Sequence, residues 1–266
     1  LDGGDGDDQV SGGDGDDTIL GGAGDDQLFG GAGADSIEGG EGDDQISGGD
    51  GGDHLWGDIG FDVIWGGAGS DVLVDVVNSP DFSDGPVLDF FTRSATNLTA
   101  AAKTAGVGHY VALSIVGCDG LPDSGYMRAK VAQERIITES GLPHTIVRAT
   151  QFHEFADAIT ASLIVDGEVR VPEGLIQPIA GADVAAEVAR VAQAAPVNGI
   201  VNIGGPDKLT FAGLAKLALA HRGESLPIVV DPAATYFGTK VGDTGLVTSG
   251  DAIISDLHLA DWLANR

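Results

Sequence analysis

A nine-residue repeat opens the chain and constrains its fold more than any other feature. From Gly3, the pattern G-G-x-G-x-D-x-U-x, in which U is aliphatic, recurs as GGDGDDQVS, GGDGDDTIL, GGAGDDQLF, GGAGADSIE, GGEGDDQIS, GGDGGDHLW, GDIGFDVIW and GGAGSDVLV. The sixth position is always aspartate: Asp8, Asp17, Asp26, Asp35, Asp44, Asp53, Asp62 and Asp71. The eighth position is always aliphatic: Val10, Ile19, Leu28, Ile37, Ile46, Leu55, Ile64 and Leu73. A low-complexity linker would not keep both residue types in phase, so a repeat structure is predicted.

The residue types at each position predict how one repeat folds. Glycine tolerates positive φ, so each GGxGxD stretch can form a tight turn. The x-U-x stretch that follows can form a short strand with its aliphatic residue turned inward. Stacked turns give a parallel β-roll whose edges carry carboxylates and turn carbonyls, which are the hard oxygen ligands that Ca²⁺ prefers. Trp56 and Trp65, at the ninth position of successive repeats, are expected to pack as a pair.

Charge is distributed unevenly and marks a boundary. Residues 1–75 contain 18 Asp and 2 Glu with no Lys or Arg, whereas the remainder has a net charge of −8. We therefore predict two domains, residues 1–74 and 75–266. The unopposed negative charge repels nucleic acids and anionic membranes and requires cations. No apolar run reaches the length of a membrane span.

The repeats resemble the RTX, or hemolysin-type, calcium-binding family. The resemblance implies that the eight aspartates ligate calcium and that each ion lies between turns two repeats apart, which gives about six sites for eight repeats. Without calcium the carboxylates repel one another, and one aliphatic residue in nine does not offset the chain entropy. Folding of residues 1–74 is thus expected to require calcium. Whether the ions also regulate anything is left open.

Longer elements begin at the eighth repeat. Strands are predicted at 71–77, 109–116, 144–149 and 200–204, and helices at 84–105, 126–140, 182–194 and 210–221. Alternating strands and helices favour a parallel α/β sheet. Because residues 71–74 belong to both patterns, we expect the last turns of the roll to abut the edge of this sheet.

A second resemblance covers the chain from about residue 69 to its end. It rests on DVLVDVVNSP, HYVALSIVG, SGYMRAKVAQE, GLPHTIVRATQFHEF, QPIAGADVAAEVA and VNIGGPDKLTFAGLA, which follow one another in order. Together they resemble the NmrA-like, atypical short-chain dehydrogenase/reductase family of NAD(P)-binding proteins. The resemblance implies an incomplete Rossmann-like parallel sheet with helices on both faces, an NAD(P) cofactor and a small-molecule substrate if the domain is active.

The resemblance also assigns roles to residues. Tyr126 and Lys130 in YMRAK, with Ser114 upstream, match the family's catalytic set. The Lys130 ammonium, one helical turn away, would lower the pKa of the Tyr126 phenol and hold the nicotinamide ribose, and Ser114 would orient a carbonyl. Cofactor contacts are further implied for Asn78, Ser79, Thr150, Gln151 and Phe152.

The glycine-rich dinucleotide fingerprint does not accompany these residues. The RTX repeats stand in its place, and none of their glycine runs lies between a long strand and a helix. The sequence is compatible with three alternative functions. The chain is a calcium-binding roll joined to an inactive reductase-like domain, an NAD(P)H-dependent oxidoreductase, or a secreted structural or adhesive repeat protein. The repeats favour an extracellular location, and the reductase-like domain favours the cytoplasm.

Overall fold

The computed structural model describes residues 1–60, 62–69, 71–242 and 244–266, which form two compact units. Unit 1 comprises Leu1–Leu113, Ala129–Ile146 and Val188–Ile200, and unit 2 comprises Ser114–Arg128, Val147–Glu187 and Val201–Arg266. The boundary predicted after residue 74 falls within a strand of unit 1, Val72–Asp75. Among the described residues, the helices are all too short or too polar to cross a membrane.

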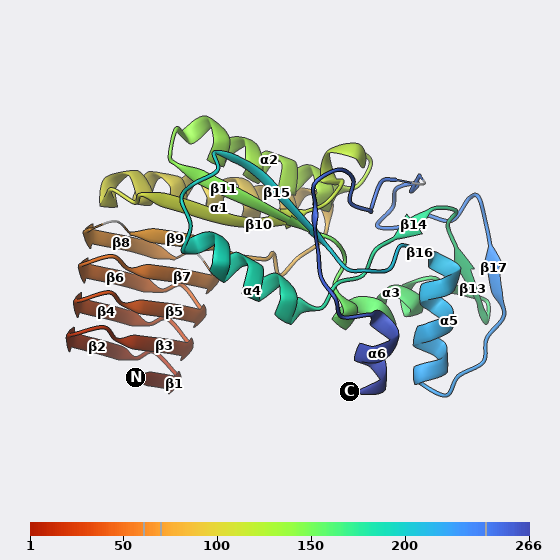
Figure 1. Cartoon of the computed structure of the whole chain (residues 1–266), viewed down its shortest axis with the longest axis horizontal. Coiled ribbons are helices and arrows are strands. Elements are labelled where there is room, and N and C mark those ends of the chain that lie inside the picture. Colours follow the sequence, from red (N-terminus) through yellow and green to blue (C-terminus); the bar gives the residue numbers. More distant parts are fainter. Residues whose placement is uncertain (61, 70, 243) are drawn as a thin grey trace. The chain divides into compact units, whose positions relative to one another are not determined.

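The repeats form the predicted parallel β-roll, in which successive repeats alternate between two sheets (Figure 1). One sheet contains β1 (Asp2–Asp5), β3 (Thr18–Ala23), β5 (Ser36–Glu41), β7 (His54–Ile59) and β9 (Val72–Asp75). The other contains β2 (Gln9–Asp14), β4 (Gln27–Ala32), β6 (Gln45–Asp50) and β8 (Val63–Ala68). One coil is therefore two repeats, and each strand pairs with the equivalent strand of the next coil, as in Ile19 beside Ile37.

The eighth-position residues build the interior of the roll. Those of repeats two to eight are at most 1% exposed, and Val10 of the first is half-buried. Trp56 in β7 and Trp65 in β8 belong to different sheets, because successive repeats alternate between the two sheets. The expectation that these two rings pack as a pair was wrong, because neighbours within a sheet come from alternate repeats and not from successive ones. Trp56 instead stacks on His54, with ring centroids 6.1 Å apart.

The strands are longer than the x-U-x stretch predicted for them. From β2 to β8 each contains six residues and continues through both glycine positions of the next repeat. The glycines are close-packed between coils: Gly49 has φ 112°, and a Cβ there would clash with the carbonyl oxygen of Gly31. Without side chains, these glycines allow neighbouring coils to stay hydrogen-bonded where a turn was expected. In the seventh repeat Asp58 replaces this glycine and still adopts φ 61°.

Strand β9 joins the roll to the α/β sheet within unit 1, as the shared residues predicted. Its register pairs Leu73 with Leu55 of β7 on one side and with Tyr110 of β10 (His109–Ile115) on the other. The sheet order is β1-β3-β5-β7-β9-β10-β11-β15-β18. Helix α1 (Asp84–Ala105) packs against β8, the last strand of the opposite roll sheet. The hypothesis that the last turns of the roll cover the edge of the α/β sheet is thus confirmed.

The α/β elements agree closely with the predicted ones. After α1 and β10 they are α2 (Gly125–Ser140), β11 (His144–Ala149), α4 (Gly181–Ala192), β15 (Gly199–Gly204) and α5 (Phe211–His221). Additional short elements occur in unit 2: α3 (Ala156–Ser162), β12 (Ile164–Val165), β13 (Glu168–Val171), β14 (Leu175–Ile176), β16 (Leu209–Thr210), β17 (Ile228–Val230), β18 (Ile253–Ile254) and α6 (Leu259–Ala264). The parallel α/β class is confirmed.

Candidate calcium ladder and nucleotide-site residues

The sixth-position aspartates form two regular ladders along the roll. In each, a backbone N–H donates to the Oδ1 of the equivalent aspartate one coil further on, at 2.8–3.4 Å. One ladder links Asp8, Asp26, Asp44 and Asp62, and the other links Asp17, Asp35, Asp53 and Asp71. The structure thus aligns all eight predicted metal ligands in two rows.

The second carboxylate oxygen of each aspartate has no protein partner. In all eight, Oδ2 is buried and accepts no hydrogen bond within the described part of the chain. A buried carboxylate oxygen without a partner is costly, so a cation or a proton is required there. The eight Oδ2 atoms are therefore the strongest structural sign of a ligand in this protein.

Backbone carbonyls converge on the same places as these oxygens. A Cβ on Gly30 would clash both with Asp35 Oδ2 and with the carbonyl oxygen of Gly48. No side chain fits there, and two oxygens from adjacent coils flank the space. No three His, Cys, Asp or Glu side chains of the described residues gather into a metal cluster. A calcium ion, with six to eight oxygen ligands, would thus rely on carbonyls beside the aspartates. The residues present fit this ion.

Burial raises the pKa of four ladder carboxyls, those of Asp44, Asp53, Asp62 and Asp71. The pKa of Asp62 rises to about 7 and that of Asp44 to about 6, chiefly by desolvation and further by neighbouring carboxylates. A backbone N–H donated to each one partly opposes the shift. The pKa values of Asp53 and Asp71 are also raised by burial. Without calcium, the folded roll thus favours protonated carboxyls at Asp44 and Asp62, and it loses their contribution to stability as the pH rises through 6 to 7.

Calcium binding should therefore weaken on mild acidification. Because calcium requires the ionised carboxylates, we expect the apparent affinity to fall by up to about tenfold per pH unit for each proton displaced, beginning near pH 7. Calorimetric calcium titrations at pH 8, 7, 6 and 5.5 would measure this. Carboxyls with ordinary pKa values near 4 would leave the affinity flat across that range, and such a result would contradict the assignment.

In unit 2, one residue assigned to catalysis, Ser114, and two assigned to cofactor binding, Thr150 and Gln151, present buried polar atoms without partners among the described residues. They are the hydroxyls of Ser114 and Thr150 and both amide atoms of Gln151, all in residues at most 8% exposed. Ser114 lies near the end of β10, and Thr150 and Gln151 directly follow β11. Ligands of parallel α/β sheets bind at the carboxyl ends of the strands. These polar atoms therefore suit hydrogen bonds to a bound small molecule.

The pKa of Tyr126 differs from the prediction. Burial raises the pKa of Tyr126 to about 12, so the predicted lowering of this pKa is not found. The Tyr126 ring lies 6.1 Å from that of Phe237, and desolvation by burial disfavours the phenolate. Phe152 stacks on Phe155 with ring centroids 5.7 Å apart.

In unit 1, Lys130 lies in a buried polar network. Its Nζ donates to the Leu113 carbonyl at 2.8 Å and to Gln133 Oε1, and it lies 4.4 Å from the centre of the Phe91 ring. Gln133 Nε2 donates to Asp75 Oδ2 at 2.9 Å. Thus one glutamine bridges a buried ammonium to a buried carboxylate, which satisfies both charges inside the protein.

Tyr110 completes this network from strand β10. Its hydroxyl donates to Asp75 Oδ2 at 2.7 Å, and burial next to this carboxylate raises the pKa of Tyr110 far above its usual value. We call Asp75, Tyr110, Lys130 and Gln133 the Lys130 network; each member is at most 3% exposed. Sequence reasoning missed Asp75 and Gln133. The signals were a charged residue within an apolar strand and a glutamine one helical turn after Lys130.

Asn78 and Ser79 form a turn of their own in unit 1. The Asn78 side-chain oxygen accepts the Ser79 N–H at 3.0 Å, and the Ser79 hydroxyl donates to the Asp81 carbonyl at 2.7 Å. These local bonds fix the chain after β9. Their assigned role as cofactor contacts stays a prediction.

Strand β7, which pairs with β9, leads into another strand of the roll in the described residues. In the doubly wound dinucleotide fold, the first strand pairs with the fourth and leads through a glycine-rich loop into a helix whose N-terminus holds the pyrophosphate. Here β9, β10 and β11 have the order of the fourth to sixth strands, and β7 takes the position of the first. Among the residues that the structure describes, the element after β7 is the strand β8, and no helix N-terminus is found at that position.

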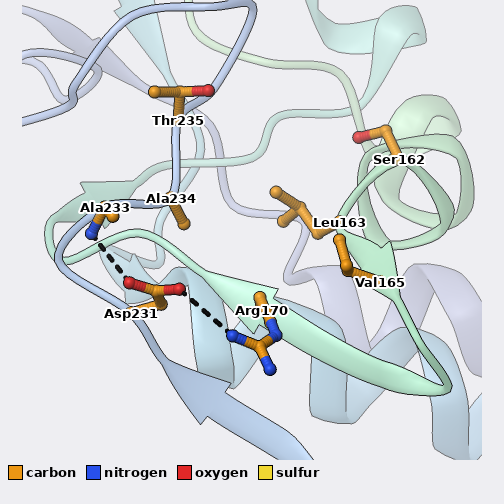
Figure 2. A pocket seen from close by; sticks show the side chains of 8 residues that line it. All are labelled: Ser162, Leu163, Val165, Arg170, Asp231, Ala233, Ala234 and Thr235. Atoms are coloured by element: carbon orange, nitrogen blue, oxygen red, sulfur yellow. Dashed lines mark hydrogen bonds and ion pairs between the residues drawn. The ribbon is translucent and has the colours of Figure 1, made fainter.

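A shallow cavity of about 260 Å³ lies elsewhere in unit 2, between α3, β13 and the segment after β17 (Figure 2). It is lined by Ser162, Leu163, Val165, Arg170, Asp231, Ala233, Ala234 and Thr235. Asp231 accepts the Ala233 N–H at 2.8 Å and pairs with Arg170 at 3.6 Å. None of the predicted site residues lines it, and its charged groups are occupied with one another.

Known protein families match both the repeats and the α/β part of the chain. The profile of the RTX calcium-binding nonapeptide repeat matches residues 2–37, 20–55 and 47–74. The profile of the NAD(P)H-binding family matches residues 63–195, which is half of the chain. The chain belongs to the NAD(P)H-binding family. The two matches overlap over residues 63–74, the stretch that leads into β9. No curated protein is similar enough to match.

Solved structures share the fold at low identity. MoeE5, in complex with UDP-glucose and NAD, has a TM-score of 0.53 at 13% identity, covering 84% of this chain and 96% of that one. The NADPH-dependent quinone oxidoreductase QOR2 of Escherichia coli has 0.52 at 16%, covering 74% and 90%. The Bordetella bronchiseptica enzyme WbmG, in complex with NAD and UDP, has 0.49 at 16%, covering 65% of this chain. This chain spans only 63% of the length of WbmG.

The extent of the MoeE5 match bears on the roll. Residues 75–266 make up less than three quarters of the chain. A superposition that covers 84% of the chain must therefore include some of the repeats. Parts of the roll thus occupy positions that belong to the fold of that NAD-bound structure, as the place of β7 in the strand order indicates.

Proposed function

We propose that this protein is a calcium-binding protein whose RTX roll folds on binding about six calcium ions. The observation that carries the proposal is the set of eight buried Oδ2 atoms, four in each ladder, that have no partner within the described part of the chain. Each pair of successive aspartates in a ladder would share one ion with the turn carbonyls of the same coil. The ions act chiefly as structural elements, and residues 1–74 are the calcium-binding domain.

Calcium stoichiometry and single substitutions test this proposal. We expect about six ions per chain, because each ladder contains three pairs of successive aspartates and each pair would bind one ion. Asp35→Asn, which alters a carboxylate shared by two ladder pairs, should lower the stoichiometry by about two. Asp123→Asn is the matched control, because Asp123 is exposed and outside the roll. Equal calcium binding by both variants and the parent chain would exclude the ladder as the site.

We propose in addition that the α/β domain, residues 75–266, is a reductase-like domain without turnover. The arguments are the strand β8 where a phosphate-binding helix would begin, the engagement of Lys130 with Gln133 and Leu113, and the raised pKa of Tyr126. A phenol with a pKa of about 12 is poorly matched to proton transfer near pH 7.

One observation favours the alternative, an NAD(P)H-dependent oxidoreductase. The unpartnered polar atoms of Ser114, Thr150 and Gln151 fit hydrogen bonds to a nicotinamide nucleotide or a carbonyl substrate. Such a nucleotide would supply the hydride, whereas Ser114 would orient the carbonyl. Asn78, Ser79, Lys130 and Phe152 would supply the remaining cofactor contacts that the family resemblance implies.

Nucleotide titration separates the two possibilities. The calcium-loaded chain is titrated with NADPH and with NADH while nucleotide fluorescence is recorded. Under our proposal no saturable binding is expected up to millimolar nucleotide. Micromolar binding that is lost in Gln151→Leu and kept in Gln193→Leu, a control at an exposed glutamine, would establish the oxidoreductase.

We propose an extracellular location for the roll. Calcium sites of extracellular modules commonly have dissociation constants of about 10⁻⁴–10⁻³ M. A roll whose carboxylates lack other counter-charges would fold where calcium is abundant and stay unfolded where it is scarce. Calcium dissociation constants in the micromolar range or below would count against this location.

A further inference from the structure

We infer that calcium in the last coil of the roll holds the α/β part of unit 1 together through strand β9, so that calcium binding and the Lys130 network are thermodynamically coupled. The last coil is repeats seven and eight, of which the structure describes residues 57–60, 62–69 and 71–74. The inference rests on the proposed calcium binding and adds a consequence for the α/β part.

Asp71 takes part both in an aspartate ladder of the roll and in the α/β sheet. Its side chain ends one aspartate ladder: Oδ1 accepts the Asp53 N–H at 3.4 Å, and Oδ2 is buried without a partner. Its backbone carbonyl accepts N–H groups of the α/β sheet, from Gly108 at 3.0 Å and from His109 at 3.3 Å. A cation bound at Asp71 would therefore fix the residue that starts β10.

Strand β9 depends on neighbours on both of its edges. The Val72 N–H donates to the Asp53 carbonyl at 2.7 Å, and Val72, Leu73 and Val74 each pair with a residue of β7 and with one of β10. The strand has four residues, all of them buried. If the coil carrying β7 opened, β9 would become an edge strand that retains hydrogen bonds on one side only.

The far end of β9 anchors the Lys130 network. Asp75 accepts hydrogen bonds from Tyr110 and from Gln133, which also binds the buried Lys130 ammonium, so displacement of β9 withdraws a buried acceptor from this network. Only the apolar part of β9 separates Asp71 from Asp75. Helix α1, whose Phe91 lies under the Lys130 ammonium, also packs against β8. The two strands of the last coil thus each contact elements of the Lys130 surroundings: β9 through Asp75, and β8 through helix α1.

Coupling of this kind is reciprocal. If calcium binds only the ordered last coil, it also stabilises the elements that pack on that coil. A change that destabilises those elements then lowers the calcium affinity by the same factor. Calcium should therefore protect β9, β10 and α2 from opening. Weakening the Lys130 network should in turn lower calcium affinity in the last coil, and much less in the first.

Hydrogen–deuterium exchange of the full chain tests the inference, with calcium and with EGTA. Asp71→Asn is compared with Asp17→Asn, because these residues end the same ladder and each joins one pair. In calcium, Asp71→Asn should speed exchange in β10 and in α2 from Ala129 onward about tenfold or more, as expected for a lower opening free energy. Asp17→Asn should speed exchange only in β2 and β3.

A second variant leaves the ladder untouched. Gln133→Leu removes the bridge between Lys130 and Asp75, and it should raise the calcium concentration at which β8 and β9 become protected while that for β2 and β3 is unchanged. Protection of β10 and α2 that is equal in calcium and EGTA, beside a roll that opens in EGTA, would overturn the coupling and leave calcium binding intact. No calcium effect in any strand would overturn both proposals.

Discussion

Removal of calcium should unfold the roll completely. At a calcium concentration a hundred times the dissociation constant, each bound ion stabilises the folded state by about 2.7 kcal/mol. Several such sites together exceed the roughly 5–15 kcal/mol that holds an ordinary domain folded. The apolar interior, one aliphatic residue per repeat, provides no comparable reserve. Excess EGTA should therefore abolish the strand signal of residues 1–74 in circular dichroism.

The control for this experiment is magnesium. Mg²⁺ demands near-octahedral geometry and gives up its water reluctantly, so a ladder rich in carbonyl oxygens should select calcium. Adding millimolar magnesium to the EGTA-treated protein should leave the roll unfolded, and restoring free calcium should refold it. A spectrum unchanged by EGTA at pH 8, where protons do not replace the cation, would show that the roll is held by something else.

The sequence was sufficient to predict the parts of the fold that repeat. A period of nine with aspartate and an aliphatic residue in phase determines the roll, the inward Leu28 and Ile46, and the aligned carboxylates. The alternation of apolar strands and amphipathic helices likewise determines β10, α2 and β11. Residues 71–74 satisfy both patterns, so the junction could be predicted as well.

Interactions that join distant residues escaped prediction. The Gln133–Asp75 hydrogen bond spans 58 positions, and no local pattern in the sequence marks it. Likewise, Tyr126 and Lys130 have the spacing of the family's catalytic pair, yet burial near Phe237 raises the pKa of one and Gln133 binds the other. Desolvation and hydrogen-bond partners are properties of the folded chain, so a motif alone could not provide them.

The second large effect concerns the buried charges of the Lys130 network. Asp75→Ala should destabilise the calcium-loaded protein by roughly 2–6 kcal/mol, since the Tyr110 hydroxyl and the Gln133 amide would each lose a buried acceptor, at about 1–3 kcal/mol each. Urea unfolding in saturating calcium would show this as a lower midpoint at constant slope. Asp89→Ala is the control, because the ion pair of Asp89 with Arg93 is exposed and should contribute no more than about 0.5 kcal/mol.

Removing both charges should cost less than the sum of removing each. Lys130→Met keeps the length of the side chain and deletes the ammonium, so the double variant with Asp75→Ala lacks both of the charged groups that Gln133 bridges. We expect a coupling of at least about 1 kcal/mol between the two positions, although Gln133 separates them. Additive effects would mean that Asp75 and Lys130 act independently. Should Asp75→Ala fail to fold, Asp75→Asn, which keeps an acceptor for Tyr110, allows the same cycle to be completed.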